Sequence, residues 1–497
     1  MTTHIGDRAV VLGAGIAGLL AARVLSEAYA QVIVVDHDHL PADAVPRRCV
    51  PQGRHTHVLI ERGQQVLEEL FPGFTAELIG QGVPTLDNVR DVRWCLSGYR
   101  FPQPKSGMTV LSASRPFLED RVRARVNELP GVTIEDRCES LGLVTAPNHH
   151  RVTGVRVVRN TDGSTEEVLD ADLIVDATGR ASRAPRWLTE LGFDQPDEDK
   201  VHVGLGYATR IYRAPAVGMG SDLGVVIGPT PDAPRGGALQ MLEGDRFLVT
   251  LMGMLGDYPP TDPDGFLDFA RSLRLPDLCV AIRNADPIEQ PRSFRFPASI
   301  RRRYERLSRF PAGFLVTGDG FCSFNPIYAQ GMTVAALEAI TLRRHLNRGS
   351  EPDARAFFRD MSKVVDVPWR LSVGADLAFP EVVGDRSLGV RIANAYIPRL
   401  HAVAAHDPVL AAAFLRVAAL IDRPERLMSP RNMLRVLRQN LPHPGPHHSP
   451  PSTCGERPMT GIPTPGNAAP ARECASPARR DGHAHTPGRM AGPAHPP

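Results

Sequence analysis

Three glycines and one aspartate near the N-terminus combine residue types that can bind phosphate and sugar groups. Gly13, Gly15 and Gly18 follow one apolar run. Asp36 ends the next apolar run. Glycines at this spacing permit a tight turn, close approach of a pyrophosphate to the backbone, and close packing of a helix on a strand. A carboxylate after the second strand accepts hydrogen bonds from ribose hydroxyls, so we expect these four residues to bind a dinucleotide.

The flanking sequence predicts the elements that position these residues. The apolar run 9–12 predicts a buried strand, and the Ala- and Leu-rich run that follows predicts a helix to about Ala28. Residues 31–35 predict a second strand. A helix that begins at the glycines offers free N–H groups and the positive end of its dipole to phosphates. Glycines alone would be a weak signal, and the strand–turn–helix–strand order makes the pattern specific.

The overall composition argues against several other classes of protein. The 497 residues include 57 basic and 55 acidic side chains, and this balance does not favour nucleic acid as a partner. Seven scattered cysteines with no CxxC pair indicate neither a disulfide framework nor a bound metal. The N-terminus lacks a signal-peptide pattern. No run of about 18 apolar residues predicts a membrane span, so we expect a cytoplasmic protein.

The order of the predicted elements indicates an α/β fold in five segments. Residues 1–200 and 301–350 are expected to form a Rossmann-like FAD/NAD(P)-type nucleotide-binding domain. Residues 201–300 predict an inserted, mostly antiparallel β-sheet on the substrate side. Residues 351–440 have the apolar periodicity of helices. Residues 441–497 are rich in proline and histidine and poor in large apolar residues, which predicts a disordered tail.

Two later turns also follow buried apolar runs. The sequence Asp176-Ala177-Thr178-Gly179-Arg180 ends one such run, and Gly318-Asp319 ends another. A loop with proline and glycine then leads to Gly331-Met332, where a long helix is predicted to begin. Arg115 follows Ser114, a favourable N-cap residue, at the start of another predicted helix. Arg115 is therefore either a phosphate ligand or an ordinary surface arginine.

A basic segment with two histidines is open to two interpretations. Its side chains either hold phosphate and line a site or form a solvated loop: Arg47, Arg48, Arg54, His55 and His57. The two histidines have no third ligand nearby in sequence, which makes a metal site a poor explanation.

Together, these separated stretches resemble the FAD-dependent monooxygenases of the para-hydroxybenzoate hydroxylase superfamily over about residues 8–350. A narrower likeness, over most of residues 8–435, is to the flavin epoxidases of bacterial polyether biosynthesis, relatives of squalene epoxidase. It rests on four stretches: Val50 to His57, Ser114-Arg115, the Asp176 turn with Trp187-Leu188 and Leu191-Gly192, and Asn325 to Met332.

The resemblance implies that FAD is the cofactor and gives each matching position a role. The three glycines of the first turn would hold the pyrophosphate, and Asp36 the adenosine ribose. The remaining FAD contacts would come from Arg115, from Asp319 at the ribityl or pyrophosphate portion, and from the N–H groups of Gly331 and Met332 at the flavin N1–C2=O edge. We expect FAD to be bound non-covalently, because the sequence has no attachment motif.

The reaction implied is the transfer of one oxygen atom from O2 to an alkene in a lipophilic polyketide or terpenoid, as in antibiotic biosynthesis. A flavin C4a-hydroperoxide would deliver the oxygen, and no side-chain base would be needed. Electrons would come from NAD(P)H or a partner flavin reductase, since only one dinucleotide pattern is present. Thr178-Gly179 replaces the Asp-Gly of aromatic hydroxylases, which leaves the mode of reduction open.

Other functions remain open on the sequence alone. An aromatic polyketide hydroxylase would benefit from a base that ionises the ring hydroxyl. A prenyl-chain reductase of the same fold, or a non-catalytic FAD-binding or chaperone protein, would be distinguished by assay. A tryptophan-type halogenase is disfavoured, because its Trp-x-Trp-x-Ile-Pro motif is absent and three tryptophans stand alone: Trp94, Trp187 and Trp369.

Overall fold

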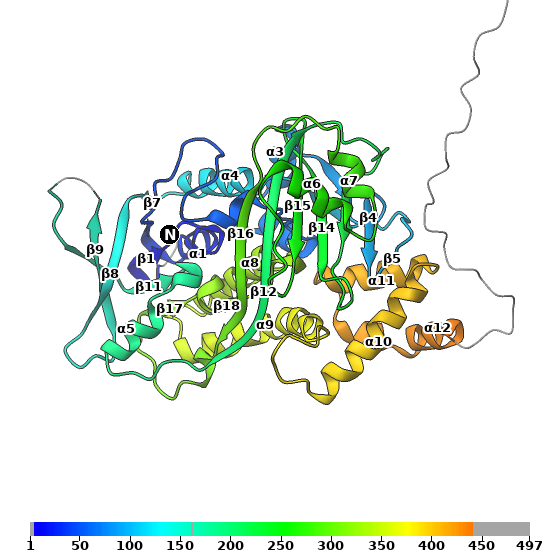
Figure 1. Ribbon diagram of the computed structural model, residues 1–497. Helices are drawn as coiled ribbons and strands as arrows, with labels where there is room; N and C mark the ends of the chain where they lie inside the picture. The colour runs from blue at the N-terminus through cyan, green and yellow to red at the C-terminus, as the bar shows by residue number, and fades with distance from the viewer. Residues whose placement is uncertain (1–3, 161–162, 441–497) are drawn as a thin grey trace, which may run out of the picture. The chain divides into compact units, whose positions relative to one another are not determined.

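The computed structural model describes residues 4–160 and 163–440, and the statements below concern those residues. The predicted disordered tail, residues 441–497, lies outside them. The described chain has the α/β architecture that the sequence predicts, with one parallel and one mostly antiparallel sheet (Figure 1).

The parallel sheet carries the first turn. Its strands lie in the order β17-β11-β1-β2-β7, an order that places β1 between two parallel neighbours. The apolar run of β1 is fully buried, as expected of a strand covered on both faces. The strand bounds are β1 Gly6–Leu12, β2 Tyr29–Val35, β7 Val132–Glu135, β11 Leu173–Asp176 and β17 Phe314–Val316.

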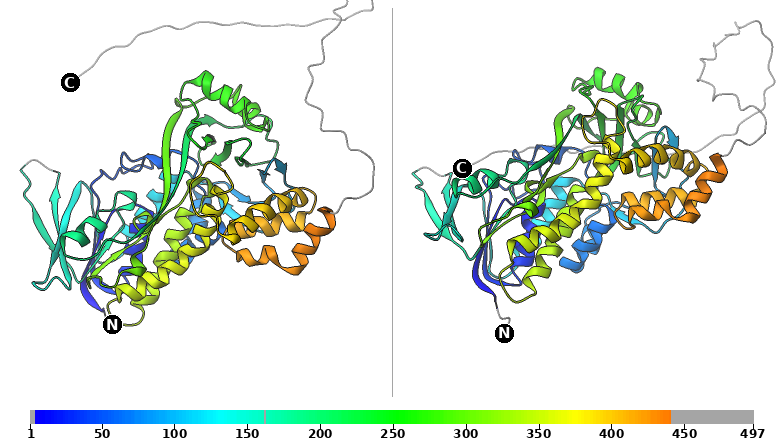
Figure 2. Two further views of the ribbon diagram at one scale, coloured as in Figure 1. Left: turned by 60° about the horizontal axis from the view of Figure 1, so that its bottom comes forward. Right: turned by 90° about the horizontal axis from the view of Figure 1, so that it is seen from below.

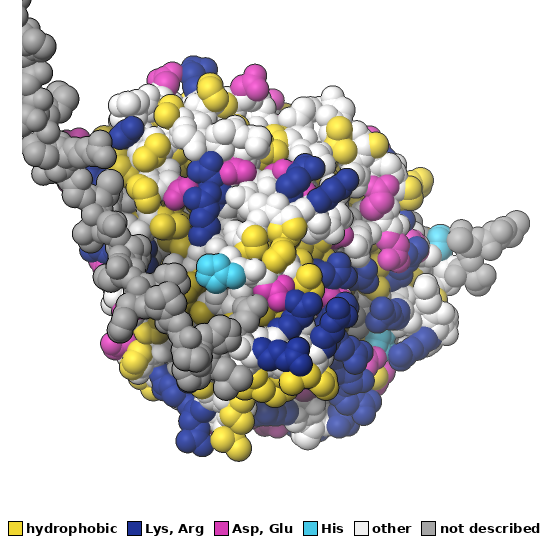
Figure 3. Space-filling model, turned by 90° about the vertical axis from the view of Figure 1, so that its right-hand side faces the viewer, with side chains coloured by type: hydrophobic (Ala, Val, Ile, Leu, Met, Phe, Trp, Pro, Cys, Tyr) yellow, Lys and Arg dark blue, Asp and Glu magenta, His cyan; other side chains and the backbone are white. Residues whose placement is uncertain are grey.

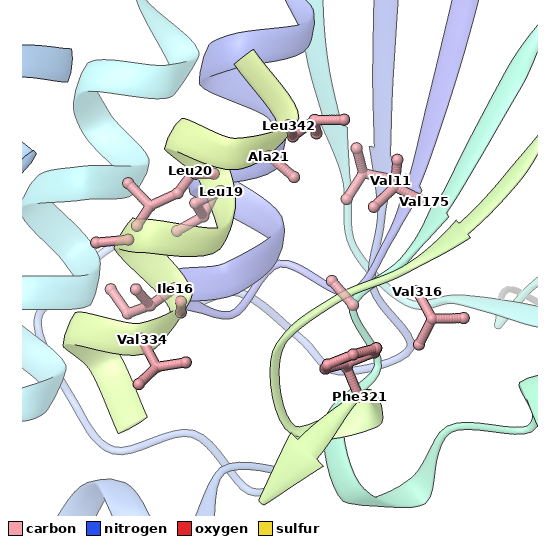
Figure 4. Close-up of a cluster of buried hydrophobic side chains, with 14 of the residues drawn as sticks. Val11, Ile16, Leu19, Leu20, Ala21, Val175, Val316, Phe321, Val334 and Leu342 are labelled. Atoms are coloured by element: carbon pink, nitrogen blue, oxygen red, sulfur yellow. The ribbon is translucent and has the colours of Figure 1, made fainter. Parts of the chain in front are cut away.

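Helices α1 (Ile16–Leu25) and α8 (Gly331–Leu346) pack together on this sheet. Figure 4 shows Leu19 and Leu20 of α1 among side chains from α8 and the strands. These apolar contacts fix both helices relative to the strand ends. Both helices begin just after a turn that the sequence marks as part of the site. The core of this domain therefore sets the position of two helix N-termini.

Helix α4 begins where the sequence predicts. It spans Arg115–Asn127, and the Ser114 hydroxyl accepts a hydrogen bond from the Phe117 N–H at 3.3 Å. This N-cap confirms the predicted helix start. The cap makes Arg115 the first residue of α4, and α4 packs against α1.

The second large sheet has eight strands in the order β18-β16-β12-β15-β14-β13-β4-β5 (Figure 1). Its pairing is antiparallel except between β13 and β4. It therefore draws strands from well before and just after the predicted insertion at 201–300. The bounds are β4 Val92–Leu96, β5 Tyr99–Arg100, β12 Glu198–Arg213, β13 Gly224–Ile227, β14 Arg235–Leu242, β15 Arg246–Gly253, β16 Arg292–Arg302 and β18 Cys322–Ser323.

Two small antiparallel sheets complete the strands. In the first, β9 pairs with β10, and β8 joins β9 on its other side. The bounds are β8 Cys138–Thr145, β9 Val152–Arg159, β10 Glu167–Asp170, and, in the two-stranded sheet, β3 Thr85–Asp87 and β6 Thr109–Leu111.

The region after α8 is helical, as predicted, but the helices are separated by loops. Helix α9 (Ala354–Asp376) packs beside α8 (Figure 2). Three further helices share a separate apolar core: α10 Leu388–Ala404, α11 Pro408–Ala418 and α12 Pro430–Asn440. The remaining helices are α2 Glu61–Leu70, α3 Phe74–Gly80, α5 Ala184–Glu190, α6 Pro263–Arg271 and α7 Asp277–Ile282.

Within residues 4–160 and 163–440, no helix is both long and apolar enough to cross a membrane. The same residues contain no group of three or more His, Cys, Asp or Glu side chains placed to hold a metal. On the face shown in Figure 3, hydrophobic side chains are scattered among charged ones.

Candidate functional site

A cavity of about 540 Å³ lies where the carboxyl ends of the parallel strands meet α1 and α8. Ligands of open parallel sheets bind at this edge. All the predicted site residues except Gly18 line the cavity: Gly13, Gly15, Asp36, Arg115, Asp319, Gly331 and Met332. The fold thus brings together stretches that are up to about 300 residues apart in sequence. The volume of the cavity is in the usual range for small-molecule sites.

The three glycines of the first turn have distinct surroundings. Gly13 has φ of +99°, a conformation that other residues rarely adopt. A Cβ on Gly18 would lie 1.8 Å from the Gly13 carbonyl oxygen, so Gly18 is needed for packing. A Cβ on Gly15 would meet no described atom within 4 Å, since Gly15 faces the cavity. Gly15 therefore leaves room for a ligand.

Two helix N-termini open onto the cavity. The N-cap residues of α1 and α8 are Gly15 and Gln330, and in the described structure neither end has a side-chain cap. A Cβ on Gly331 would also meet no described atom within 4 Å. Free N–H groups and two positive dipole ends fit a ligand with phosphates at one end and an electron-accepting ring at the other.

Asp36 lies at the cavity edge and is already hydrogen-bonded. Its Oδ2 accepts from the Ala14 N–H and from Arg47 Nη2, both at 2.7 Å, and its Oδ1 accepts from the Asp38 N–H at 2.8 Å. A carboxylate has about four acceptor positions, so one remains for a ribose hydroxyl. The predicted ribose ligand is thus also the partner of a buried arginine.

Arg47 and Arg115 share a buried carboxylate. Glu119 accepts from Arg47 Nη1 at 2.8 Å and from Arg115 Nη2 at 3.0 Å. Burial alone would raise the pKa of Glu119, but Arg115 and Arg47 hold that pKa below its usual value. Arg115 is therefore held in place along the cavity and is not an ordinary surface arginine.

Asp319 lies in the turn after β17, with its carboxylate toward the cavity. Burial raises the pKa of Asp319. Among the described residues, no donor is hydrogen-bonded to its side chain, which leaves the carboxylate available to ligand hydroxyls. Beneath it, Glu338 of α8 accepts from the Gly318 N–H at 2.6 Å and the Thr317 hydroxyl at 2.8 Å. Burial raises the pKa of Glu338 to about 7.

The turn after β11 lines the same cavity. Asp176 accepts from the Thr178 N–H at 2.9 Å and from the Ser182 hydroxyl at 2.7 Å, which fixes the turn. Arg180 then lies over the rings of Phe294 and Phe296, with its guanidinium carbon 5.2 and 5.5 Å from their centroids. The cavity is thereby bounded by the turns that follow β1, β11 and β17 and by β16 of the large sheet.

The basic segment is not a solvated loop. Arg47 is buried, and His57 lines the cavity. His55 is 2% exposed, and its Nδ1 lies 2.7 Å from the Thr209 hydroxyl of β12. Burial lowers the pKa of His55 to about 3 and that of His57 to about 4, so both rings are neutral near pH 7. Arg48, in contrast, is exposed.

Three buried acidic residues in or next to the cavity wall were not predicted. Glu338 lines the cavity, Glu119 bonds to Arg47 and Arg115, and Asp376 bonds to Asn325. A carboxylate at a buried helical position requires hydrogen-bonded or charged partners. An acid in an apolar stretch of the sequence is the signal that would have identified Glu338 and Asp376, whereas Glu119 follows no such signal, because its helix is rich in charged residues.

Comparison with known proteins identifies one related sequence and several solved structures of similar fold. No family model matches the chain. Protein Rv3254 of Mycobacterium tuberculosis is 36% identical over 460 residues, which cover 89% of this chain and 96% of that protein. The flavin-dependent brominase Bmp2 superposes with a TM-score of 0.62 at 15% identity, over 88% of this chain and 100% of its own.

A second structural relative is pqsL, a probable FAD-dependent monooxygenase from Pseudomonas aeruginosa. It superposes with a TM-score of 0.54 at 16% identity, over 75% of this chain and 94% of its own. At these identities the likeness concerns the fold. The chain has the fold of flavin-dependent monooxygenases and halogenases.

Proposed function

The chain belongs to the family of Protein Rv3254, and we propose that it is an FAD-dependent monooxygenase. The reaction proposed is insertion of one oxygen atom from O2 into a lipophilic natural-product intermediate, with epoxidation of an alkene as the specific chemistry. The observation that carries the proposal is that the turns at Gly15, Asp319 and Gly331 line the same cavity. The epoxidase assignment rests on the motif likeness described above.

The residues present fit FAD in their chemistry. The N–H groups at the start of α1 would hold the pyrophosphate, with Gly15 leaving the space that it needs. The remaining acceptor position of Asp36 would take a ribose hydroxyl, and Asp319 would take ribityl hydroxyls. No cysteine, histidine or tyrosine motif for covalent attachment is present in the sequence, so the proposal is non-covalent binding.

The protein would contribute electrostatics and exclusion of water. When bound and reduced, FAD supplies the electrons that activate O2 for transfer of one oxygen atom. The N–H groups of Gly331 and Met332, at the positive end of α8, would stabilise negative charge on the ring edge. Phe294 and Phe296 would keep the substrate side apolar, which limits unproductive loss of the activated oxygen.

The electron donor is proposed to be NAD(P)H, either docking transiently or acting through a partner flavin reductase. The sequence has one dinucleotide pattern, so no separate domain is expected to hold NAD(P)H. Reduction by NAD(P)H alone and reduction with an added flavin reductase would distinguish these routes.

The test is to purify the protein, identify any released flavin by mass spectrometry, and supply lipophilic polyenes with isotopically labelled O2, a halide salt and NAD(P)H, with and without an added flavin reductase. We expect FAD in the protein and one labelled atom in an epoxide, or in the diol or ether formed from it. Label only on aromatic hydroxyls would support a hydroxylase instead. A saturated product without label would indicate a reductase, and a halogenated product would indicate a halogenase. Protein that binds no flavin would overturn the proposal.

A further inference from the structure

The loop before α8 is fastened to helix α9 by one carboxyl group. Asp376, the last residue of α9, is 0% exposed. Its Oδ1 accepts from Asn325 Nδ2 at 2.8 Å and from the Tyr328 hydroxyl at 2.9 Å. Both donors belong to residues 325–331, here named the 325–331 loop. A single acid from a distant helix thus holds the loop at two points.

The shape of the 325–331 loop decides where α8 begins. Asn325 Oδ1 also accepts from the Ile327 N–H at 3.2 Å, which caps a short 3-10 turn at Pro326–Tyr328. Ala329 then takes φ of +53°, a left-handed conformation that is unfavourable for alanine. Such a conformation persists only where the surroundings hold it. Gly331 follows as the first residue of α8 and lines the cavity.

The surroundings of Asp376 favour a neutral acid. Tyr328 of the loop and Tyr207 of β12 are the titratable groups around it, and the His55 ring lies 5.7 Å from the Tyr207 ring. Arg386, after α9, donates to backbone carbonyls of Leu377, Phe379 and Val382. Among the described residues, no cation forms an ion pair with Asp376. A buried carboxylate without a cation is costly, and burial raises the pKa of Asp376 to about 7.

We propose that Asp376 is a positioning residue, which holds the 325–331 loop in its cofactor-binding shape through its hydrogen bonds to Asn325 and Tyr328. Asp376 acts through Asn325 and Tyr328, both of which belong to the loop that carries Gly331. The proposal rests on the proposed function for the identity of the ligand, FAD. It does not depend on which substrate is oxidised.

Burial of the Asp376 carboxyl group should make both stability and FAD affinity depend on pH. An aspartate in the unfolded chain has a pKa of about 3.9, below the value in the fold. The unfolded chain therefore loses this proton first, and the free energy of unfolding falls as pH rises from about 4 to about 7, then levels off. Anionic FAD close to the loop would favour the neutral acid further, so FAD affinity should also fall as pH rises through about 7.

The experiment compares Asp376→Asn and Asp376→Ala with the wild type and with Asp385→Asn, an exposed acid in the loop after α9. Asparagine keeps an acceptor for both hydrogen bonds and stays neutral, whereas alanine leaves both donors unpaired. FAD affinity is measured by quenching of flavin fluorescence, and unfolding by urea, from pH 5 to pH 8. Tyr328→Phe, alone and combined with Asp376→Ala, tests whether Tyr328 acts through the acid.

We expect Asp376→Asn to bind FAD within about threefold of the wild type at pH 6 and to lose the part of the wild-type pH dependence of both readouts that Asp376 contributes, while the part due to Glu338 remains. The unfolding equilibrium constant of the wild type should change relative to this variant by up to about tenfold per pH unit between pH 5 and pH 7. Asp376→Ala should weaken FAD binding at least tenfold, with no further loss from Tyr328→Phe. Asp385→Asn should match the wild type.

Two results would overturn the inference. One is an Asp376→Asn protein with the same pH dependence as the wild type, because Asp376 would then not be the titrating group. The other is an Asp376→Ala protein that folds and binds FAD as tightly as the wild type, because the loop would then not need the acid. Absence of FAD binding in every protein would instead refute the proposed function, and the unfolding profile would still decide the protonation of Asp376.

Discussion

Replacing Gly15 with valine should empty the cofactor site while leaving the fold intact. Gly15 has φ of −78° and ψ of 178°, an extended conformation that valine adopts without strain. A Cβ at this position meets no described atom within 4 Å, so the side chain would project into the cavity and not into the protein. The perturbation therefore falls on the ligand alone.

The magnitude follows from the contacts that the valine would block. Charge-assisted hydrogen bonds from the start of α1 to a pyrophosphate are worth about 1.5–3 kcal/mol each. Losing one or two of them should weaken FAD binding by roughly one to four decades, at about 1.4 kcal/mol per decade. The free energy of unfolding of the cofactor-free protein should change by about 0.5 kcal/mol or less, as for substitutions that meet no neighbour.

Gly18→Ala is the matched control, because it places a methyl group 1.8 Å from the Gly13 carbonyl oxygen. Forced overpacking of this kind costs about 1–3 kcal/mol or more, so this variant should lose stability even without FAD. The assay is flavin content of the purified protein together with urea unfolding after the flavin is removed. A Gly15→Val protein that retains full FAD content would refute the assignment of the first turn to the pyrophosphate.

Two further predictions concern buried acids of the site. Asp36→Ala should weaken FAD binding by one to several decades and also lower the free energy of unfolding by about 3 kcal/mol, because buried Arg47 loses a partner; unchanged FAD affinity on titration would exclude Asp36 as the ribose ligand. Glu338→Gln should remove a pH dependence: the pKa of about 7 in the fold exceeds the unfolded value, so wild-type stability should fall relative to the variant as pH rises from about 4 to about 7. The assignment would be contradicted if the free energy of unfolding, measured with urea, changed equally between pH 5 and pH 8 in the wild type and in Glu338→Gln.

The sequence predicts those parts of the fold that depend on residues close together in the chain. The β1 turn needs only a buried run, glycines at fixed spacing and a helix, and all three lie within residues 9–25. The start of α4 at Arg115 likewise depends on one neighbouring hydroxyl, that of Ser114. Short-range signals of this kind predict the structure correctly because the interacting residues are adjacent in sequence.

The parts that the sequence does not predict depend on partners far apart. Strand β4 joins the large sheet only by pairing with β13, which lies more than a hundred residues later. The chain of ion pairs from Asp36 through Arg47 and Glu119 to Arg115 likewise joins three segments. Each residue alone resembles an ordinary surface charge in the sequence, and only the fold shows that the set is buried along the cavity.

The basic segment shows how distant pairing changes the interpretation of a motif. His55 contacts the Thr209 hydroxyl, which lies 2.6 Å from the Thr250 hydroxyl, and Thr56 donates to Thr250 at 2.8 Å. This buried chain ties the segment that borders the cofactor cavity to β12 and β15 of the large sheet. Thr56 and His57 line the cavity, so these hydrogen bonds join two strands of the large sheet to the cavity wall. We therefore expect a substitution at Thr209 or Thr250 to displace the wall at Thr56 and His57.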